Sequence, residues 1–278
     1  MRIRRLTMPA IRLKTPRAVI KAALILVAIV MPPAHAANAT LIVPPFLPEA
    51  ELRETYSPMM EFIAKHSGID LTLQTYPNYL AYWQATLNGY DRALALDPAP
   101  IVDFRVQRQG WTVLAQLEDS TSQTLAVHQD NLIVDPAELV NKPLAVMPSP
   151  SLSTLVMYQI FPNSLQQPEL VFKDSSRDVA EALFANEVEA VVIPTALMDG
   201  YPELVTVTRT EPLPSLGFSA APDLSSDEQS RLREALLALS STTEGQRLLE
   251  ESGLKPVVPA SNADYQGQAQ LLEGTFGY

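Results

Sequence analysis

Strand-like and helix-like segments alternate along most of this chain. Residues 40–43, 70–75 and 92–96 have the short apolar or alternating pattern of strands, and residues 49–66 and 78–88 between them have apolar side chains at helical spacing. Strands that alternate with helices pair in parallel and carry the helices on the faces of the sheet. This part of the chain therefore predicts an α/β unit.

The alternation starts again further along. Strand patterns recur at residues 124–128, 144–147, 169–172, 190–193 and 214–220, and helical patterns recur at residues 176–185, 225–239 and 243–251. Two α/β units and a helical tail are too much for one small sheet, so we expect an α/β fold with two lobes. Lobe 1 is predicted to comprise residues 37–120 and 213–278, and lobe 2 residues 121–212. Because the chain crosses between them twice, the crossings form a hinge, and the cleft between the lobes is the natural ligand site.

Residues 1–36 differ in kind from the rest. They hold seven Lys and Arg and no acidic residue, followed by an apolar run at 22–31 and a small-residue site at Ala34-His35-Ala36. This order is that of a secretory signal peptide, and the apolar run is about half the ~20 residues that a membrane span needs. We expect cleavage near Ala36, or after Ala39, and an extracytoplasmic mature protein. An uncleaved N-terminal anchor is the alternative.

The composition of the remaining chain excludes several classes of protein. Without residues 1–36 it holds 13 Lys and Arg against 31 Asp and Glu, a formal net charge of −18. Such a surface repels nucleic acid and anionic lipid at a distance, so we expect no nucleic-acid partner. The absence of cysteine excludes disulfides and thiolate chemistry. No second apolar run is long enough to span a bilayer, and nothing signals an oligomer, so we expect a monomer that does not cross the membrane.

Catalytic motifs are also missing. The sequence has no Gly-x-Ser-x-Gly elbow, no paired-histidine metal spacing and no glycine-rich phosphate loop, and only His66 and His128 follow the signal segment. We therefore expect a protein that is not an enzyme and that carries no cofactor or metal.

Four hydroxyl side chains gather before a predicted helix. Ser149, Ser151, Ser153 and Thr154 lie within six residues, directly before an apolar run at helical spacing. A helix N-terminus has unpaired N–H groups and a partial positive charge, and hydroxyls beside it add hydrogen-bond donors. The cluster therefore predicts an anion site. The alternative is that Ser151 or Ser153 only caps the helix, a contribution of about 1 kcal/mol.

Several longer segments carry a family resemblance. They are YPNYLAYWQATLNGYDRALAL at 76–96, NKPLAVMPSPSLST at 141–154, DSSRDVAEALFANEVEAVVI at 174–193, and a tail with GFSAAPDLSSDEQSRLREALLAL at 217–239 and EGQRLLEESGLKPVVPASNADY at 244–265. In this order and spacing they resemble the phosphonate-type (PhnD-like) periplasmic substrate-binding proteins of ABC transporters. The resemblance covers nearly all the chain after the signal segment. It implies the type II periplasmic binding protein fold, a location in the periplasm and an ABC permease as partner.

The resemblance also implies a function. Family members capture a small solute in an interlobe cleft for an importer, so the expected ligand is a small anion such as phosphonate, phosphite or phosphate. In the family, hydroxyls of the second-lobe turn hold this oxyanion, a role that falls here on the cluster Ser149, Ser151, Ser153 and Thr154.

The chain departs from the family pattern at three places. Thr154 stands where glycine is usual, DPAPIVDF at 97–104 replaces a segment that usually supplies a ligand tyrosine, and Arg177 stands where a histidine often follows serine. These departures motivate a second hypothesis. In it, the chain is a periplasmic sensor or accessory protein with the same scaffold that regulates a membrane signalling receptor, with a different ligand or none.

Five further side chains are candidates for ligand contact. Tyr76 and Tyr79 follow the second predicted strand and either face the cleft or are partly buried. Arg177 suits a bidentate clamp on an oxyanion, or is an ordinary residue at a helix start. Thr195 is positioned to donate from the opposite wall. Asp97 suits an amino group or a cation, or caps a helix.

Overall fold

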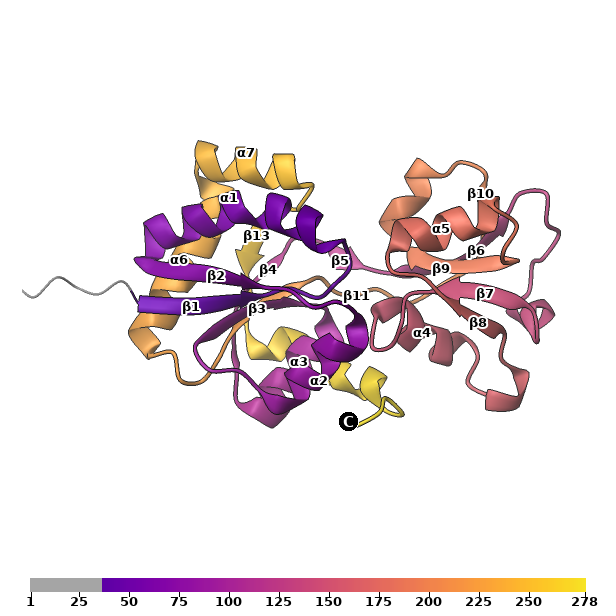
Figure 1. Ribbon diagram of the computed structural model, residues 1–278, viewed down its shortest axis with the longest axis horizontal. Helices are drawn as coiled ribbons and strands as arrows, with labels where there is room; N and C mark the ends of the chain where they lie inside the picture. Colours follow the sequence, from indigo (N-terminus) through magenta and orange to yellow (C-terminus); the bar gives the residue numbers. More distant parts are fainter. Residues whose placement is uncertain (1–36) are drawn as a thin grey trace, which may run out of the picture. The chain divides into compact units, whose positions relative to one another are not determined.

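The computed structural model describes residues 37–278. The predicted signal peptide and its cleavage at Ala36 lie outside these residues. A six-stranded sheet has the order β13-β4-β12-β3-β1-β2, and a five-stranded sheet has the order β10-β6-β9-β7-β8 (Figure 1). The predicted alternation of strands and helices is thus present, arranged as two mixed sheets.

The six-stranded sheet is built from both ends of the described chain. Its strands are β1 (Ala37–Ile42), β2 (Ile69–Gln74), β3 (Ala93–Asp97), β4 (Thr112–Leu117), β12 (Gly217–Ala220) and β13 (Val257–Pro259). Strand β1 pairs in parallel with β2 and β3, whereas β12 runs antiparallel between β3 and β4. The late strands β12 and β13 therefore complete a sheet that the early strands begin.

Helices cover both faces of this sheet (Figure 1). They are α1 (Glu49–Ser67), α6 (Ser226–Ser241) and α7 (Thr243–Ser252) on one face, and α2 (Tyr79–Asn88) and α3 (Ala99–Gln109) on the other. Leu52, Phe62 and Ile63 of α1 pack with Leu232 and Leu236 of α6 in one buried cluster, because each helix turns its apolar stripe toward the sheet. The tail adds two short 3-10 helices, η4 (Asn262–Tyr265) and η5 (Gln268–Leu272), which pack against α3.

The five-stranded sheet comes from one continuous stretch of chain. Its strands are β6 (Gln123–His128), β7 (Pro143–Val146), β8 (Glu169–Phe172), β9 (Ala190–Pro194) and β10 (Leu204–Arg209), with helices α4 (Leu152–Ile160) and α5 (Ser176–Phe184) and the short 3-10 helices η1 (Pro136–Leu139), η2 (Ser164–Gln166) and η3 (Thr195–Gly200). Strand β7 lies between β8 and β9 and is parallel to both. The turns that follow these three strands therefore lie at one edge of the sheet.

Two chain segments lead from one sheet to the other, and they pair with each other. Strand β5 (Ser120–Thr121) precedes β6, strand β11 (Leu213–Pro214) precedes β12, and the two are antiparallel. We propose that the two sheets with their helices are the two lobes predicted from the sequence, and that this paired crossing is their hinge.

Several elements differ from the sequence-based expectation. No helix was predicted at 97–104, but this segment ends β3 and begins α3, because Pro98 and Pro100 fit a first helical turn and the following apolar residues are buried. Strands β4 and β10 were not predicted, and the strand expected at 214–220 is divided into β11 and β12. Each of these strands gains its hydrogen bonds from a partner distant in the sequence, which local patterns do not reveal.

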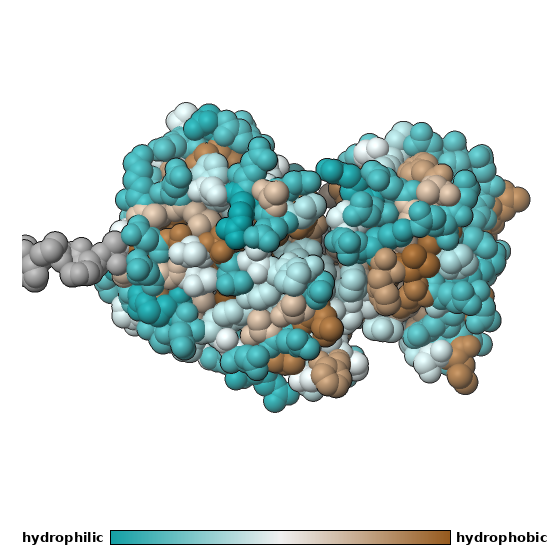
Figure 2. Space-filling model, in the orientation of Figure 1, coloured by the Kyte–Doolittle hydropathy of each residue, from teal (hydrophilic) through white to brown (hydrophobic). Residues whose placement is uncertain are grey.

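Among the helices of residues 37–278, none combines the length and apolar character that a membrane span requires. On the face shown in Figure 2, hydrophilic residues predominate and the apolar ones form separate patches.

Gly245, in the first turn of α7, lies against the backbone of Leu239 at the end of α6. A Cβ at this position meets the Leu239 Cα and carbonyl oxygen at 2.4 Å. We expect Gly245→Ala to lower the free energy of unfolding by about 1–3 kcal/mol, since the backbone has to shift. Urea denaturation is the measurement. Gly200→Ala is the matched control, because a Cβ there meets nothing within 4 Å; equal stability losses in both variants contradict the prediction.

Glu228 at the start of α6 links this helix to the turn before β3. Its carboxylate accepts a hydrogen bond from Arg92 at 2.6 Å, and the bonds from Arg92 and Ser225 lower the pKa of Glu228 from 4.5 to about 2. A carboxyl whose folded-state pKa is depressed stabilises the fold above its unfolded-state pKa and loses this contribution as the pH falls through the folded-state pKa.

We therefore expect Glu228→Gln to be less stable than the original chain at pH 7, with the difference fading between pH 4.5 and about 2. Denaturant unfolding across this pH range measures it. Glu250→Gln, at an exposed position in α7, is the control. A difference that does not change with pH argues against the ion pair as its source.

Candidate functional site

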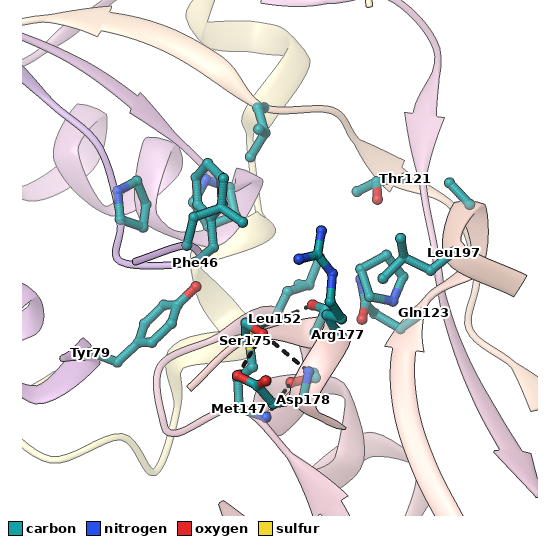
Figure 3. A pocket seen from close by; sticks show the side chains of 18 of the residues that line it. Phe46, Tyr79, Thr121, Gln123, Met147, Leu152, Ser175, Arg177, Asp178 and Leu197 are labelled. Carbon is teal, nitrogen blue, oxygen red and sulfur yellow. Dashed lines mark hydrogen bonds between the residues drawn. The ribbon is translucent and has the colours of Figure 1, made fainter. Parts of the chain in front are cut away.

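Turns at the strand ends of both sheets line one pocket with a volume of about 540 Å³ (Figure 3). The turns after β1 and β3 contribute from one side, and those after β7, β8 and β9 contribute from the other. Crevices at the carboxyl ends of parallel strands are the usual ligand sites of open α/β sheets, because the connections diverge there. Most of the lining side chains are apolar.

Three of the four hydroxyls at the start of α4 are bonded to the turn that precedes this helix. Ser151 Oγ donates to the Met147 carbonyl at 2.8 Å, Thr154 Oγ1 donates to the same carbonyl, and Ser153 Oγ accepts from the Met147 N–H at 3.1 Å. All three side chains are buried, and Ser151 is the N-cap of α4. Of the cluster, Ser153 lines the pocket, whereas Ser149, Ser151 and Thr154 do not. Ser151 therefore caps helix α4, which is the alternative to ligand contact that the sequence left open.

The N-terminus of α5 also reaches the pocket. Ser175 is its N-cap, accepting from the Asp178 N–H at 3.1 Å and donating to the Asp178 carboxylate at 2.7 Å. Ser176 and Arg177 occupy the first two helical positions, where N–H groups have no partner within the helix. Both residues line the pocket, so the positive end of this helix adjoins it.

The side chain of Arg177 extends from α5 into the pocket (Figure 3). It is exposed, and within residues 37–278 it forms neither a hydrogen bond nor an ion pair. Ser153 and Arg177 are thus two sequence-based candidates that the structure brings together on one wall.

Tyr79 belongs to the opposite wall, at the first position of α2. Its ring is buried, and its hydroxyl points toward the pocket with no hydrogen-bond partner in the described part of the chain (Figure 3). A tyrosine hydroxyl is protonated at neutral pH, and burial raises the pKa of the Tyr79 hydroxyl further. Tyr79 is therefore placed as a hydrogen-bond donor facing Arg177 across the pocket (Figure 3). Tyr76 lines a smaller neighbouring hollow, and its hydroxyl is bonded to that of Tyr90.

Gln123, the first residue of β6, was not among the sequence-based candidates. It lines the pocket at 3% exposure, and its Oε1 has no hydrogen-bond partner among residues 37–278. Its signal in the sequence is slight: a long polar side chain at the start of an otherwise apolar strand. The pairing of β6 with β9 places Gln123 at the pocket, because Gln123 lies opposite Pro194 at the end of β9.

The structure corrects the placement of Asp97. Its carboxylate is fully buried, accepts from Arg105 Nε at 2.6 Å and also accepts from the Tyr82 hydroxyl. Arg105 in turn lies over the Trp111 ring at 4.4 Å. The charge of Asp97 is therefore paired inside the protein, and Asp97 does not line the pocket. The sequence left open a ligand contact or a capping role for Asp97, whereas here Arg105 of helix α3 pairs with its carboxylate inside the protein.

Thr195 is likewise turned away from the pocket. Its hydroxyl accepts from Ser122 at 2.8 Å and bonds Thr124 at 2.8 Å, which ties the end of β9 to the start of β6. Within the described range, no group of three or more His, Asp or Glu side chains converges as metal ligands do.

The buried Asp97–Arg105 pair predicts a large stability effect. Arg105→Met leaves the Asp97 carboxylate buried without its cation, and we expect a loss of about 3–5 kcal/mol in the free energy of unfolding. The double variant Asp97→Asn/Arg105→Met regains part of it, since no charge is then left unpaired. Urea denaturation is the measurement.

The control for this pair is Arg53→Met, which breaks the exposed Arg53–Glu49 pair and is expected to cost less than about 1 kcal/mol. A double variant no more stable than Arg105→Met contradicts the interpretation.

The family model for the phosphonate periplasmic substrate-binding proteins of ABC transporters matches residues 41–265. No curated protein sequence matches the chain.

Solved structures show the same fold. PhnD1 from Prochlorococcus marinus in complex with methylphosphonate is similar with a TM-score of 0.73 at 14% identity, covering 86% of this chain and 98% of that one. A binding protein of a Pseudomonas aeruginosa ABC phosphonate transporter gives 0.70 at 14% identity, over 85% and 86% of the two chains. A Xanthomonas citri protein bound to ATP gives 0.70 at 15%, over 86% and 96%. The predicted α/β fold of the type II periplasmic binding proteins is confirmed.

Proposed function

Because the chain belongs to the phosphonate-type periplasmic substrate-binding proteins of ABC transporters, we propose that it captures a small oxyanion in the 540 Å³ pocket and delivers it to a permease. Membership in this family confirms the resemblance predicted from the sequence. It implies a periplasmic transport protein, rather than an enzyme, with a small-molecule ligand and a permease partner.

One observation carries the proposal: Arg177 extends into the pocket without a partner among residues 37–278. A guanidinium presents parallel N–H donors that match the two oxygens of a phosphonate, sulfonate or carboxylate. No described carboxylate competes for this guanidinium by forming an ion pair with it. An unpaired one at a pocket wall is therefore available to a ligand.

The surroundings of Arg177 favour the same chemistry. The free N–H groups of Ser176 and Arg177 stand at the positive end of α5, which attracts negative charge. Tyr79 adds a protonated hydroxyl from the other wall. A ligand that contacts both walls favours the closed arrangement of the lobes, because it binds that state more tightly.

The ligands named for two structural neighbours support the oxyanion class. One is in complex with methylphosphonate and another is bound to ATP, and both ligands carry phosphorus oxyanions. Two features disfavour the binding of an anion. The chain without residues 1–36 has a formal charge of −18, and the carboxylates of Glu51 and Asp178 line the pocket. Local donors therefore have to hold the anion against an unfavourable field.

Calorimetric titration with phosphate, phosphite, methylphosphonate, phenylphosphonate and benzenesulfonate tests the proposal. We expect at least one to bind, and to raise the free energy of unfolding by about 2.7 kcal/mol at 100 times its dissociation constant. Arg177→Ala is expected to weaken that binding about 10- to 100-fold, since hydrogen bonds to charged groups contribute about 1.5–3 kcal/mol.

The matched control is Arg209→Ala, at an exposed arginine of β10 outside the pocket, which leaves binding unchanged. Binding of none of the anions, or equal binding by Arg177→Ala and the original chain, overturns the proposal.

The inward-turned hydroxyls of Ser151 and Thr154 favour the second function considered above, a sensor or accessory protein for a membrane receptor. These hydroxyls, which hold the ligand in the family, are occupied by the Met147 carbonyl here. Purification of the tagged chain from solubilised membranes separates the two functions: an ABC permease as the bound partner supports transport, and a signalling receptor supports the sensor.

A further inference from the structure

The walls of the pocket allow an inference about the body of the ligand, which rests on the proposed function. We propose that the captured oxyanion carries an apolar body of about the size of an aromatic ring, and that a bare or methyl-sized oxyanion is a poor ligand.

Size is the first argument. The pocket volume of about 540 Å³ lies within the range of roughly 300–1,000 Å³ typical of pockets for drug-sized ligands. A tetrahedral oxyanion displaces roughly the volume of two water molecules, about 60 Å³ at about 30 Å³ per water. Such an ion alone leaves most of the pocket to solvent.

The chemistry of the walls is the second argument. Phe46 and Leu47 line one side of the pocket, Leu152 and Leu197 line the other, and Leu216 lies at the crossing into β12. All five side chains are half-buried, so each keeps apolar surface in contact with water. Burial of such surface is favourable, and none of these side chains can hydrogen-bond a second oxyanion.

The charges of the pocket are the third argument. Arg177 is the cation of the lining, and it shares the pocket with the carboxylates of Glu51 and Asp178. One guanidinium and one helix N-terminus suit a single anionic group. A ligand with several negative charges would be repelled by the carboxylates of Glu51 and Asp178. The polar contacts therefore orient the ligand by one end, and the apolar body supplies the remaining binding free energy.

Gln123 gives independent support that the pocket receives a ligand. The residue is 3% exposed and lines the pocket, and its buried Oε1 has no hydrogen-bond partner among residues 37–278. A buried amide without a partner carries a desolvation cost that packing alone does not offset. The unpaired atom is an acceptor, so a hydrogen-bond donor at the far end of the apolar body, or a water held there, would remove this cost.

Matched pairs of probes test the inference, since within each pair only the body differs. Benzenesulfonate is compared with methanesulfonate, and phenylphosphonate with methylphosphonate, by calorimetric titration of the full mature chain. We expect the aryl member of at least one pair to bind about tenfold or more tightly than its methyl counterpart. Leu197→Ala is expected to weaken aryl binding several-fold and to leave any methyl binding unchanged.

Leu165→Ala, at an 87% exposed leucine outside the pocket, is the control and leaves all affinities unchanged. Thermal unfolding of both variants verifies that they fold.

Methyl probes that bind as tightly as their aryl partners overturn the inference and leave the proposed function standing. If only phosphate or phosphite binds, the inference fails; if neither of them nor any of the four probes binds, the proposed function itself fails. If benzyl alcohol binds as tightly as benzenesulfonate, the anionic group is not recognised and the oxyanion proposal fails.

Discussion

Parallel pairing of β7 with β8 and β9 is the constraint on which the candidate site depends. Parallel strands require helical crossovers, so the chain leaves each strand at the same edge and begins a helix there. Two helix N-termini, those of α4 and α5, therefore face one pocket from the five-stranded sheet. The turns after β1 and β3 face it from the six-stranded sheet for the same reason.

The polar residues at this edge divide into two groups with different tasks. Ser151, Ser153 and Thr154 bind the backbone of Met147 and fix the turn that leads into α4. Arg177 and Tyr79 line the pocket with hydrogen-bond donors that no described residue occupies, and the Oε1 of Gln123 is an unpaired acceptor. A rigid turn beside unpaired donors is an arrangement that holds a ligand with little reorganisation, because the supporting bonds are already formed.

Local pattern was sufficient for most elements of the fold and for part of the site. Apolar periodicity and caps located α1, α2, α5 and α6 within a few residues, since a helix satisfies its backbone within its own segment. The short strands β4 and β10 and helix α3 were missed. Their residues carry weak local signals, and sheet pairing or burial against distant segments stabilises them.

The amino-acid sequence by itself determined the α/β class, the family, and the presence of hydroxyls and Arg177 at two helix starts, because these follow from periodicity and order along the chain. Only the tertiary structure decided which side chains reach the pocket. Asp97 and Arg105 lie eight residues apart and neutralise each other when α3 folds over β3, while Gln123 gains its place from pairing with β9. A side chain's partners depend on what folds next to it, and no pattern along the chain specifies that.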